Sequence, residues 1–555
     1  DDKNRVTRFV SEVDGSSIVT EYVYGDLNNG QMPDYPYGVK LDGNQILSYA
    51  YDSLGRMTSR TVDLGTDYRT AYGFLDNTDG TTTTLVDEVT ESVDGASHVW
   101  SYTYDERGNI TEIHLDSELL YRYSYDNLDQ LVQEEDHVTD HLHVYTYDAG
   151  DNWTSHRICD LSDPWDPLSV DSYTYGDAGW KDKLTAYNGE SITYDEIGNP
   201  LTWRDGAALS WQHGRELASY TKGGETYTYR YDEDGYRVAK QHGDTVTTFY
   251  LNGSSVLTQK TGDERIDFLY DDNSQLLGLK YNGMAYYYRK NLQGDITGIL
   301  DPDGEQVVSY TYDAWGNPTS CTGSLAGSIG QKNPFRYRGY YYDTESGLYY
   351  TASRYYDPEV GRFLSPDAID TLTATPSALT DKNLYAYCDN NPVMRQDSSG
   401  EFWDLFSAAV GAVVNVATTV ISSAVTGQKI SFRDVRVAAV SGALQAGGIR
   451  LKLAGALINT GYTFFSSLDS GASLAGAFLS GVTAGVTTFA SVSNLAGFAS
   501  KGINLSVNVG LDATFGFGGN LISAVTNRIV VDNGKQSQKS STNKKIEKAK
   551  SSQTT

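Results

Sequence analysis

Aromatic and polar side chains alternate along short stretches of the first two-thirds of the chain. Trp100, Tyr102 and Tyr104 are separated by polar residues, and side chains that recur with a period of two lie on one face of a β-strand. An Asp-x-x-Gly sequence follows. Its carboxylate can accept backbone N–H groups and its glycine tolerates a positive φ, so it predicts a turn. An apolar residue two positions after the glycine, such as Met57 or Ile110, begins the expected return strand.

This turn belongs to a repeat that is marked by the dipeptide Tyr-Asp. Ten copies occur, with their tyrosines at Tyr51, Tyr104, Tyr125, Tyr147, Tyr194, Tyr231, Tyr270, Tyr312, Tyr342 and Tyr356. The steps from Tyr104 to Tyr125 and from Tyr125 to Tyr147 are 21 and 22 residues, enough for two short strands and two turns. One hairpin of this kind cannot bury its aromatic face alone. We therefore expect residues 1–332 to form a continuous array of strands.

A second pattern, rich in tyrosine and arginine, follows the array. Its motifs are Asn333–Tyr340, Gly347–Pro358, Gly361–Asp367, Asn383–Tyr387 and Asn390–Val393. Together with the Tyr-Asp repeats, they resemble the RHS/YD-repeat family, including the shells of Tc-toxin C components and teneurins. Residues 333–400 are similar to the RHS repeat-associated core domain of that family.

The resemblance implies a mostly β fold in which the repeats form a spiralling sheet that closes into a hollow shell. It also implies that the core domain plugs one end and that a C-terminal segment lies inside as cargo. The chain starts at Asp1 among repeats, without an initiator methionine or a signal peptide. We therefore expect an N-terminally truncated piece, and the resemblance implies a secreted or cell-surface bacterial protein.

Charge divides the chain at about residue 400. The whole chain has 43 Lys and Arg against 72 Asp and Glu, a net charge of −29, whereas residues 401–555 contain 13 Lys and Arg against 7 Asp and Glu. The acidic array argues against nucleic-acid binding by the shell. Its charge has two interpretations that stay open: solubility of a large surface, or attraction of a basic cargo.

The residues after 400 are rich in Gly, Ala, Ser and Thr, and we expect residues 401–532 to be a hydrophobic helical pre-toxin or cargo segment. Two uncharged runs, 405–428 and 470–500, are long enough to span a bilayer. They could be a buried helical hairpin or packed cargo, membrane-inserting helices of a toxin, or a permanent anchor. The Lys-rich tail, 533–555, has no apolar periodicity, and we expect it to be disordered.

We find no pattern of a catalytic toxin, cofactor or metal site in this chain. Residues 401–555 contain no histidine or cysteine, and their acidic residues are scattered. The cluster His137, His141 and His143 has a metal-like composition, but it falls between two expected strands, and we interpret it as a polar hairpin loop. The repeat tyrosines could stack on sugars, although packing is the commoner use of tyrosines at strand spacing.

Self-cleavage is the most specific chemistry that the resemblance implies. In self-processing relatives two aspartates flank an Asn-Leu-Tyr block and cut the chain just after the second, and by position these correspond to Asp367 and Asp397. Two carboxylates that share a site can act as acid and base. The family pattern Asp-Pro-x-Gly is altered at both places, because Ala368 follows the first aspartate and Ser398 the second. The alternative is that both aspartates only close turns.

The predicted function is that of a shell that encapsulates and presents a C-terminal effector or translocation segment in bacterial competition or toxin delivery. Its expected partners are its own C-terminal segment, an upstream delivery region, an immunity protein and, through runs 405–428 and 470–500, a membrane. The alternatives are a surface adhesion or carbohydrate-binding protein and a pore-forming C-terminal effector. Any enzymatic activity would be at most the aspartyl self-cleavage.

Overall fold

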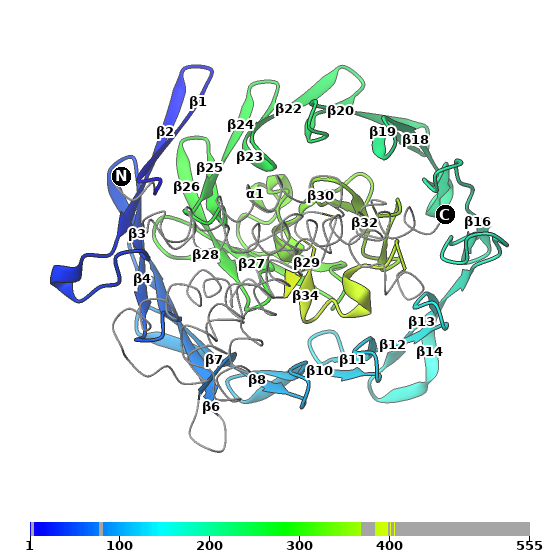
Figure 1. The fold of residues 1–555 in the computed structure, drawn as a ribbon, viewed down its shortest axis with the longest axis horizontal. Helices are drawn as coiled ribbons and strands as arrows, with labels where there is room; N and C mark the ends of the chain where they lie inside the picture. The colour runs from blue at the N-terminus through cyan, green and yellow to red at the C-terminus, as the bar shows by residue number, and fades with distance from the viewer. Residues whose placement is uncertain (2–4, 77–81, 368–382, 398–399, 401–403, 406–555) are drawn as a thin grey trace, which may run out of the picture. The chain divides into compact units, whose positions relative to one another are not determined.

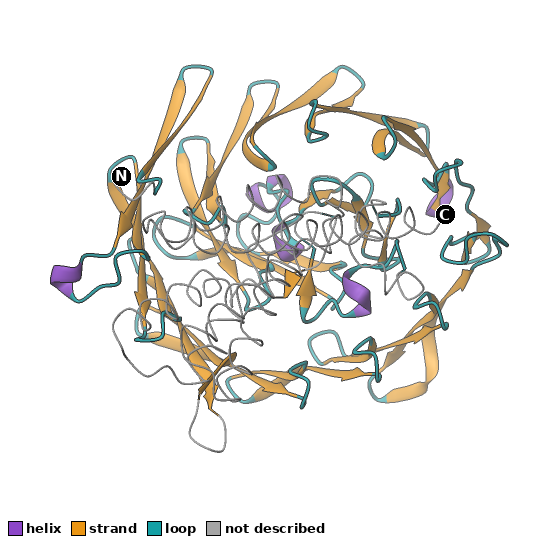
Figure 2. Ribbon diagram, in the orientation of Figure 1, coloured by secondary structure: helices purple, strands orange, loops and turns teal. Residues whose placement is uncertain are grey.

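A computed structural model describes the chain except for residues 2–4, 77–81, 368–382, 398–399, 401–403 and 406–555. The described residues lie in one compact unit, Asp1–Val410. Strands dominate this unit, and its helices are single turns (Figure 2). Of the helical segment predicted for 401–532, only Asp404–Leu405 are described, and they form a two-residue strand instead of a helix. The rest of that segment, the tail 533–555, the remainder of run 405–428 and run 470–500 lie outside the described residues.

Two large antiparallel sheets form the wall of the unit. The first sheet has 16 strands in chain order: β1 (Arg8–Val13), β2 (Ser16–Tyr24), β3 (Pro36–Leu41), β4 (Asn44–Tyr51), β5 (Met57–Val62), β6 (Tyr68–Asp76), β7 (Thr82–Val93), β8 (Ala96–Tyr104), β9 (Ile110–Leu115), β10 (Glu118–Tyr125), β11 (Leu131–Asp136), β12 (His141–Tyr147), β13 (Trp153–Asp160), β14 (Asp163–Thr174), β15 (Ala186–Tyr187) and β16 (Glu190–Ser191). The second has 13: β17 (Thr202–Trp203), β18 (Ala207–Gln212), β19 (Glu216–Lys222), β20 (Glu225–Tyr231), β21 (Arg237–His242), β22 (Thr245–Asn252), β23 (Ser255–Thr261), β24 (Glu264–Tyr270), β25 (Leu276–Tyr281), β26 (Met284–Lys290), β27 (Ile296–Leu300), β28 (Gln306–Tyr312) and β29 (Pro318–Thr322).

The remaining elements are short. They are η1 (Leu27–Asn29), η2 (Arg204–Gly206), α1 (Ile329–Lys332), η3 (Tyr337–Gly339) and η5 (Cys388–Asn390), the four-stranded sheet β30 (Tyr341–Asp343), β31 (Leu348–Tyr350), β32 (Tyr355–Asp357) and β33 (Arg362–Phe363), and the pair β34 (Arg395–Gln396) and β35 (Asp404–Leu405). We call residues 333–397 the core segment. Figure 1 shows the wall strands running around β30, β32 and β34 of this segment.

The Tyr-Asp unit at Tyr104 forms the predicted hairpin turn. The carboxylate of Asp105 accepts the backbone N–H groups of Arg107 at 2.9 Å and Asn109 at 2.8 Å, and Gly108 has a φ of 87°. The register between β8 and β9 shifts by one residue at Tyr104, a β-bulge in which Thr111 of β9 is left without a partner in the ladder. The turn prediction is therefore confirmed, and the bulge is a feature that periodicity alone did not reveal.

The repeat tyrosine also ties its hairpin to the preceding one. In seven of the ten repeats, Tyr147 included, the tyrosine hydroxyl donates a hydrogen bond to a backbone carbonyl 10 to 18 residues earlier in the chain. The pairs, at 2.5–3.0 Å, are Tyr104 with Val86, Tyr125 with Ile110, Tyr147 with Leu131, Tyr194 with Leu184, Tyr231 with Leu217, Tyr270 with Val256 and Tyr312 with Ile296. Phenylalanine could pack in the same place but could not make this bond, which explains why the repeat uses tyrosine.

The strand-face tyrosines pack in the interior. Tyr102, Tyr229 and Tyr310 are 2–5% exposed and belong to one large apolar cluster. Their rings are therefore not available to stack on a sugar, and the packing interpretation of these residues is confirmed.

The first strands of the array also contact the second sheet. Gly65 N–H donates to the carbonyl of Pro302 at 2.8 Å, and the Arg289 guanidinium binds the Glu91 carboxylate, with Nε 3.0 Å from Oε1. A separate apolar cluster joins the two sheets through Ile18, Val39, Leu41, Ile46, Leu47, Tyr49, Val62, Tyr68, Leu269, Leu277, Tyr287 and Leu300. The first strands of the wall therefore contact strands of the second sheet, and the residues that make this contact are about 200 positions apart in the sequence. We describe this contact by saying that the wall returns upon itself.

The core segment is bound to the wall through its tyrosines. Tyr349 and Tyr356 are fully buried, and their hydroxyl groups donate to the carbonyls of Gly316 and Trp315, both at 2.8 Å. These carbonyls belong to the turn between β28 and β29. A buried hydroxyl needs a partner, so each tyrosine positions the core as well as filling space.

The core segment also contacts turns of the first sheet. Asn391 donates through Nδ2 to Asn109 Oδ1 at 3.0 Å, and Asn390 donates through Nδ2 to Gln130 Oε1 at 3.0 Å. Asn109 and Gln130 each end a Tyr-Asp turn. The same turns that shape the wall therefore carry the amides that hold the core.

Candidate functional site

Arg354 lies between β31 and β32 and brings the two predicted aspartates together. Its Nη2 atom is 3.1 Å from Asp397 Oδ2 and 3.6 Å from Asp367 Oδ2. The guanidinium stacks 3.6 Å from the centre of the Phe363 ring, and its side chain is 4% exposed. The two carboxylates therefore share one buried cation, although 30 residues separate them in the sequence.

The same guanidinium contacts the backbone both before and after Asp397. Arg354 donates through Nη1 to the Leu384 carbonyl at 3.2 Å and through Nε to the Gly400 carbonyl. Gly400 has a φ of 70°, and a Cβ there would overlap Thr351 Oγ1 and lie 2.6 Å from Ser353 Oγ. The positive φ and the lack of room for a Cβ both favour glycine at this position. The hydrogen bond from Arg354 holds the Gly400 carbonyl, which lies next to the predicted break.

Buried phenols complete the surroundings of Asp397. The backbone N–H of Asp397 donates to the Tyr340 hydroxyl at 2.7 Å, and that hydroxyl lies 3.1 Å from the hydroxyl of Tyr387. Burial raises the pKa of Tyr340 and of Tyr387 well above the usual value for tyrosine. Both phenols therefore remain protonated at neutral pH and add no negative charge beside the carboxylates.

The chemistry of this arrangement combines two carboxylates, one guanidinium and one immobilised peptide carbonyl. A guanidinium hydrogen bond polarises a carbonyl, and neighbouring carboxylates can exchange a proton with water and a leaving group. Sequence reasoning identified Asp367 and Asp397 but missed Arg354 and Tyr340. The motif Gly347–Pro358 contained Arg354 from the start, but nothing local distinguishes this arginine from the others of the core segment.

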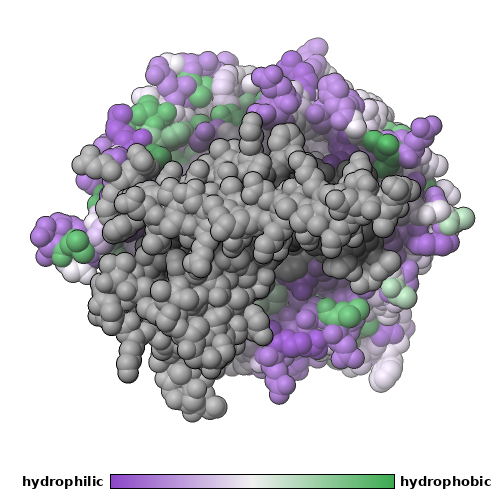
Figure 3. All heavy atoms as spheres, in the orientation of Figure 1, coloured by the Kyte–Doolittle hydropathy of each residue, from purple (hydrophilic) through white to green (hydrophobic). Residues whose placement is uncertain are grey.

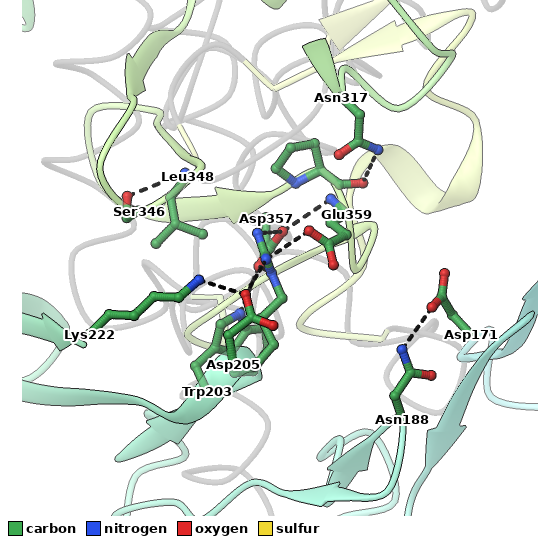
Figure 4. Close-up of polar contacts among 12 residues, drawn as sticks. Asp171, Asn188, Trp203, Asp205, Lys222, Asn317, Ser346, Leu348, Asp357 and Glu359 are labelled. Carbon is green, nitrogen blue, oxygen red and sulfur yellow. Dashed lines mark hydrogen bonds and ion pairs between the residues drawn. The ribbon is translucent and has the colours of Figure 1, made fainter. Parts of the chain in front are cut away.

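Buried ion pairs hold the core segment to the wall at other places. Asp357 of β32 accepts Trp203 Nε1 and Arg204 Nε, both at 2.7 Å, where the second sheet begins. Figure 4 shows Trp203 and Asp357 beside the more exposed pair of Lys222 and Asp205. Because the Asp357 side chain is fully buried, separating the core from the wall here would leave an uncompensated charge.

A buried carboxyl from the first sheet contacts the turn that carries Trp315. Ala314 N–H donates to both oxygens of Glu134, at 2.9 and 3.2 Å, and the Tyr145 hydroxyl lies 3.3 Å away. Burial raises the pKa of Glu134 well above its usual value, and the carboxylates of Asp313 and Asp136 act in the same direction. Burial and these two neighbours therefore favour an uncharged carboxyl, whereas the hydrogen bonds from Ala314 and Tyr145 act in the opposite direction.

The histidine cluster is not the polar loop that the sequence suggested. His141 and His143 lie in β12, and only His137 belongs to the turn before it. His143 is 6% exposed and stacks on His156 of β13, with 3.1 Å between Nδ1 and Nε2. Burial lowers the pKa of His143 to about 3, and His156 and His141 act in the same direction. It is therefore a neutral packing residue.

The part of the chain that the structure describes contains neither a metal-binding cluster nor a helix that could cross a membrane. No group of three or more His, Cys, Asp or Glu side chains there could hold a metal ion. No helix there has the length and the apolar character needed to cross a membrane.

An antiparallel wall of Tyr-Asp hairpins around a tyrosine-rich core segment defines the class of YD-repeat shells. The family model described as Teneurin YD-shell matches residues 82–393, more than half of the 555 residues, and the chain belongs to this family. The resemblance to the RHS/YD-repeat proteins is thus confirmed, as is the mostly β fold of the described residues.

Known proteins agree with this assignment. The chain is 37% identical over 298 residues to the tRNA3(Ser)-specific nuclease WapA of Bacillus spizizenii, which covers 52% of this chain and 12% of that protein. It is 24% identical over 369 residues to toxin subunit YenC1 of Yersinia entomophaga, covering 54% and 36%. The crystal structure of TcdB2-TccC3-Cdc42 shares the fold, with a TM-score of 0.54 and 20% identity over 70% of this chain and 21% of that one.

Proposed function

We propose that residues 1–400 are a container that encloses and presents a C-terminal effector or translocation segment, residues 401–532. Within the container, residues 1–332 are the wall and residues 333–400 the core that closes it. The observation that carries this proposal is the wall that returns upon itself and binds the core through buried ion pairs. Two long sheets leave few edge strands for their size, and a wall that surrounds a bound segment can keep it from aggregating or acting early.

The setting of this container is toxin delivery between bacteria. WapA and YenC1 are named as a nuclease and a toxin subunit, which supports a secreted or surface-associated protein with an upstream delivery region and an immunity partner. The chain spans about an eighth of the length of WapA and has no histidine after His242. We therefore do not extend a histidine-dependent nuclease activity to residues 401–555.

Protease protection tests the container. Native full-length chain treated with proteinase K is expected to retain peptides from residues 411–532 by mass spectrometry for as long as the wall peptides survive. In a denaturant concentration that unfolds the wall, both sets should disappear together. Removal of residues 411–532 from a chain whose wall remains intact would contradict enclosure and leave the adhesion hypothesis in place.

We further propose that the core cuts the chain after Gly400. Water attacks the Gly400 carbonyl carbon while one carboxylate of the Asp367 and Asp397 pair accepts its proton. The other, as the carboxylic acid, donates a proton to the leaving amide nitrogen as the C–N bond breaks. Arg354 supports this step through its hydrogen bond to the Gly400 carbonyl, where negative charge develops.

Intact mass spectrometry of the purified chain tests this step. We expect a fragment ending at Gly400 in the wild type and an uncut chain in both Asp367→Asn and Asp397→Asn, because each variant lacks half of the acid–base pair. The control is Asp389→Asn, which alters a half-exposed carboxylate of the same segment, paired with Arg395, and should leave cleavage unchanged. An uncut mass in all four proteins would leave the two aspartates as turn residues.

A further inference from the structure

The hairpin of β13 and β14 presents an apolar surface to solvent. The exposed fractions are 86% for Trp165, 63% for Leu168 and 53% for Val170. Trp165 is the most exposed large hydrophobic side chain among the described residues. Figure 3 shows that hydrophilic side chains predominate over the coloured, described part of the visible face. Three large apolar side chains within six residues are therefore a departure from the rest of this surface.

The same segment has an open strand edge. β14 spans twelve residues, but on the side away from β13 it pairs only through Tyr173 and Thr174 with the two-residue strand β15. Ser172 adds one more link on that side, because its N–H donates to Asn188 Oδ1 at 2.8 Å and its carbonyl accepts Asn188 N–H at 2.9 Å. Before Ser172, β14 has no strand on this side within the described residues.

The backbone of Val170 faces this open side. Since Ser172 directs its N–H and C=O toward Asn188, the residue two positions earlier directs its own to the same side. Val170 lies opposite Arg157 in the ladder, and the pairing continues with Ser169 opposite Ile158. Pro167 and Pro164 carry no N–H and limit strand addition beyond Leu168. The usable edge is therefore the stretch 168–172, long enough for one short strand.

The charge around this edge is negative. Within residues 153–174 the acidic residues are Asp160, Asp163, Asp166 and Asp171, against one arginine, Arg157. A second copy of the chain would bring its own four aspartates near these four, which is unfavourable. A strand that alternates apolar and basic side chains would instead complement both the apolar surface and its charge.

We propose that the 168–172 edge of β14 binds an extended, basic and apolar segment of a separate polypeptide as an added β-strand. Main-chain hydrogen bonds to Val170 and Ser172 supply the docking geometry, and Trp165 and Leu168 cover the apolar side chains of the partner. The surface consists of wall residues and is distinct from the Asp367 and Asp397 site, so binding and self-cleavage can be measured independently.

A direct binding experiment tests this edge. The probe is a synthetic eight-residue peptide that alternates valine with lysine, and its control is the same peptide with glutamate in place of lysine. Titrated into the full chain by calorimetry, the lysine peptide should bind at least tenfold more tightly than the glutamate peptide. Val170→Pro, which removes the outward N–H, should weaken binding at least tenfold, whereas Val170→Thr keeps that N–H and should bind within threefold of wild type.

Circular dichroism of both variants shows whether the wall remains folded, and only folded variants are compared. Failure of the lysine peptide to bind at millimolar concentration, or equal binding to folded Val170→Pro, would overturn the proposal. Sedimentation of the chain without peptide tests whether the same edge binds a second copy of the chain. A concentration-dependent dimer that Val170→Pro abolishes would assign the edge to a second copy of the chain, and that result also overturns a basic partner.

Discussion

Replacement of Arg237 by methionine is expected to lower the free energy of unfolding by about 3–5 kcal/mol, the usual cost of removing one partner from a buried ion pair. Arg237 Nη1 lies 2.5 Å from Asp343 Oδ2, and the two side chains are 1% and 0% exposed. The pair joins β21 of the wall to β30 of the core segment. Among the described residues, loss of Arg237 would leave the buried Asp343 with Lys240, 3.0 Å away, as its one cationic partner.

Denaturant titration followed by tryptophan fluorescence measures this loss. The matched control is Lys222→Met, because Lys222 pairs with Asp205 at 2.6 Å while their side chains are 38% and 51% exposed. Such a pair contributes about 0–1 kcal/mol. The double variant Arg237→Met with Asp343→Leu should recover most of the stability, since an apolar pair leaves no unpaired charge. Equal losses in Arg237→Met and Lys222→Met would refute the role of the buried pair.

The same pair predicts a dependence on pH. Burial acts to raise the pKa of Asp343, but Arg237 and Lys240 hold it below its usual value. When folding lowers the pKa of a carboxyl, the ionised group stabilises the folded state at pH values above its unfolded-state pKa of about 3.9. This stabilisation is lost as the pH falls toward and through the folded-state pKa. The stability difference between wild type and the double variant should therefore be constant near neutral pH and change only below about pH 4.

Replacement of Gly361 by alanine is expected to cost about 2–5 kcal/mol. Gly361 has a φ of 69°, where an alanine costs about 1–2 kcal/mol. A Cβ at this position would also overlap carbons of the Trp153 ring, and overpacking of a core adds about 1–3 kcal/mol. Trp153 is 4% exposed and packs edge-on against Trp315 at a centroid distance of 4.4 Å. The clash therefore reaches the contact between β13 of the first sheet and the turn after β28 of the second.

Gly30→Ala is the control for backbone strain alone. Gly30 has the same φ of 69°, but a Cβ there would have no atom within 4 Å. We expect its denaturation midpoint to fall less than that of Gly361→Ala, and only Gly361→Ala should change the near-ultraviolet circular dichroism of the tryptophans. If both variants lose equal stability, the Trp153 contact is not tight.

The individual hairpins were predictable because their determinants are local. Asp105 and Gly108 stand three residues apart in one turn, and the alternation before Tyr104 needs no other part of the chain. The site was predictable only in part. Family resemblance indicated Asp367 and Asp397, but the cation between them was not foreseen, because Arg354 belongs to a motif that precedes both.

The histidine interpretation failed for a related reason. His137, His141 and His143 are polar by composition, so the sequence favoured an exposed loop. His143 is buried because its imidazole stacks on His156 of the next strand, with 5.3 Å between ring centres. A polar residue type does not reveal a partner that another strand supplies.

By itself, the sequence determined the strand-turn unit, its repetition and the change of composition near residue 400, since these depend on residues within a few positions of each other. Only the tertiary structure decided how the wall returns upon itself, through pairs such as Glu91 and Arg289 that are 198 residues apart. Only it decided that Arg354 gathers Asp367, Asp397 and the Gly400 carbonyl. The physical reason is that a turn is selected by local backbone geometry, whereas closure and the site depend on which distant side chains bury their charges together.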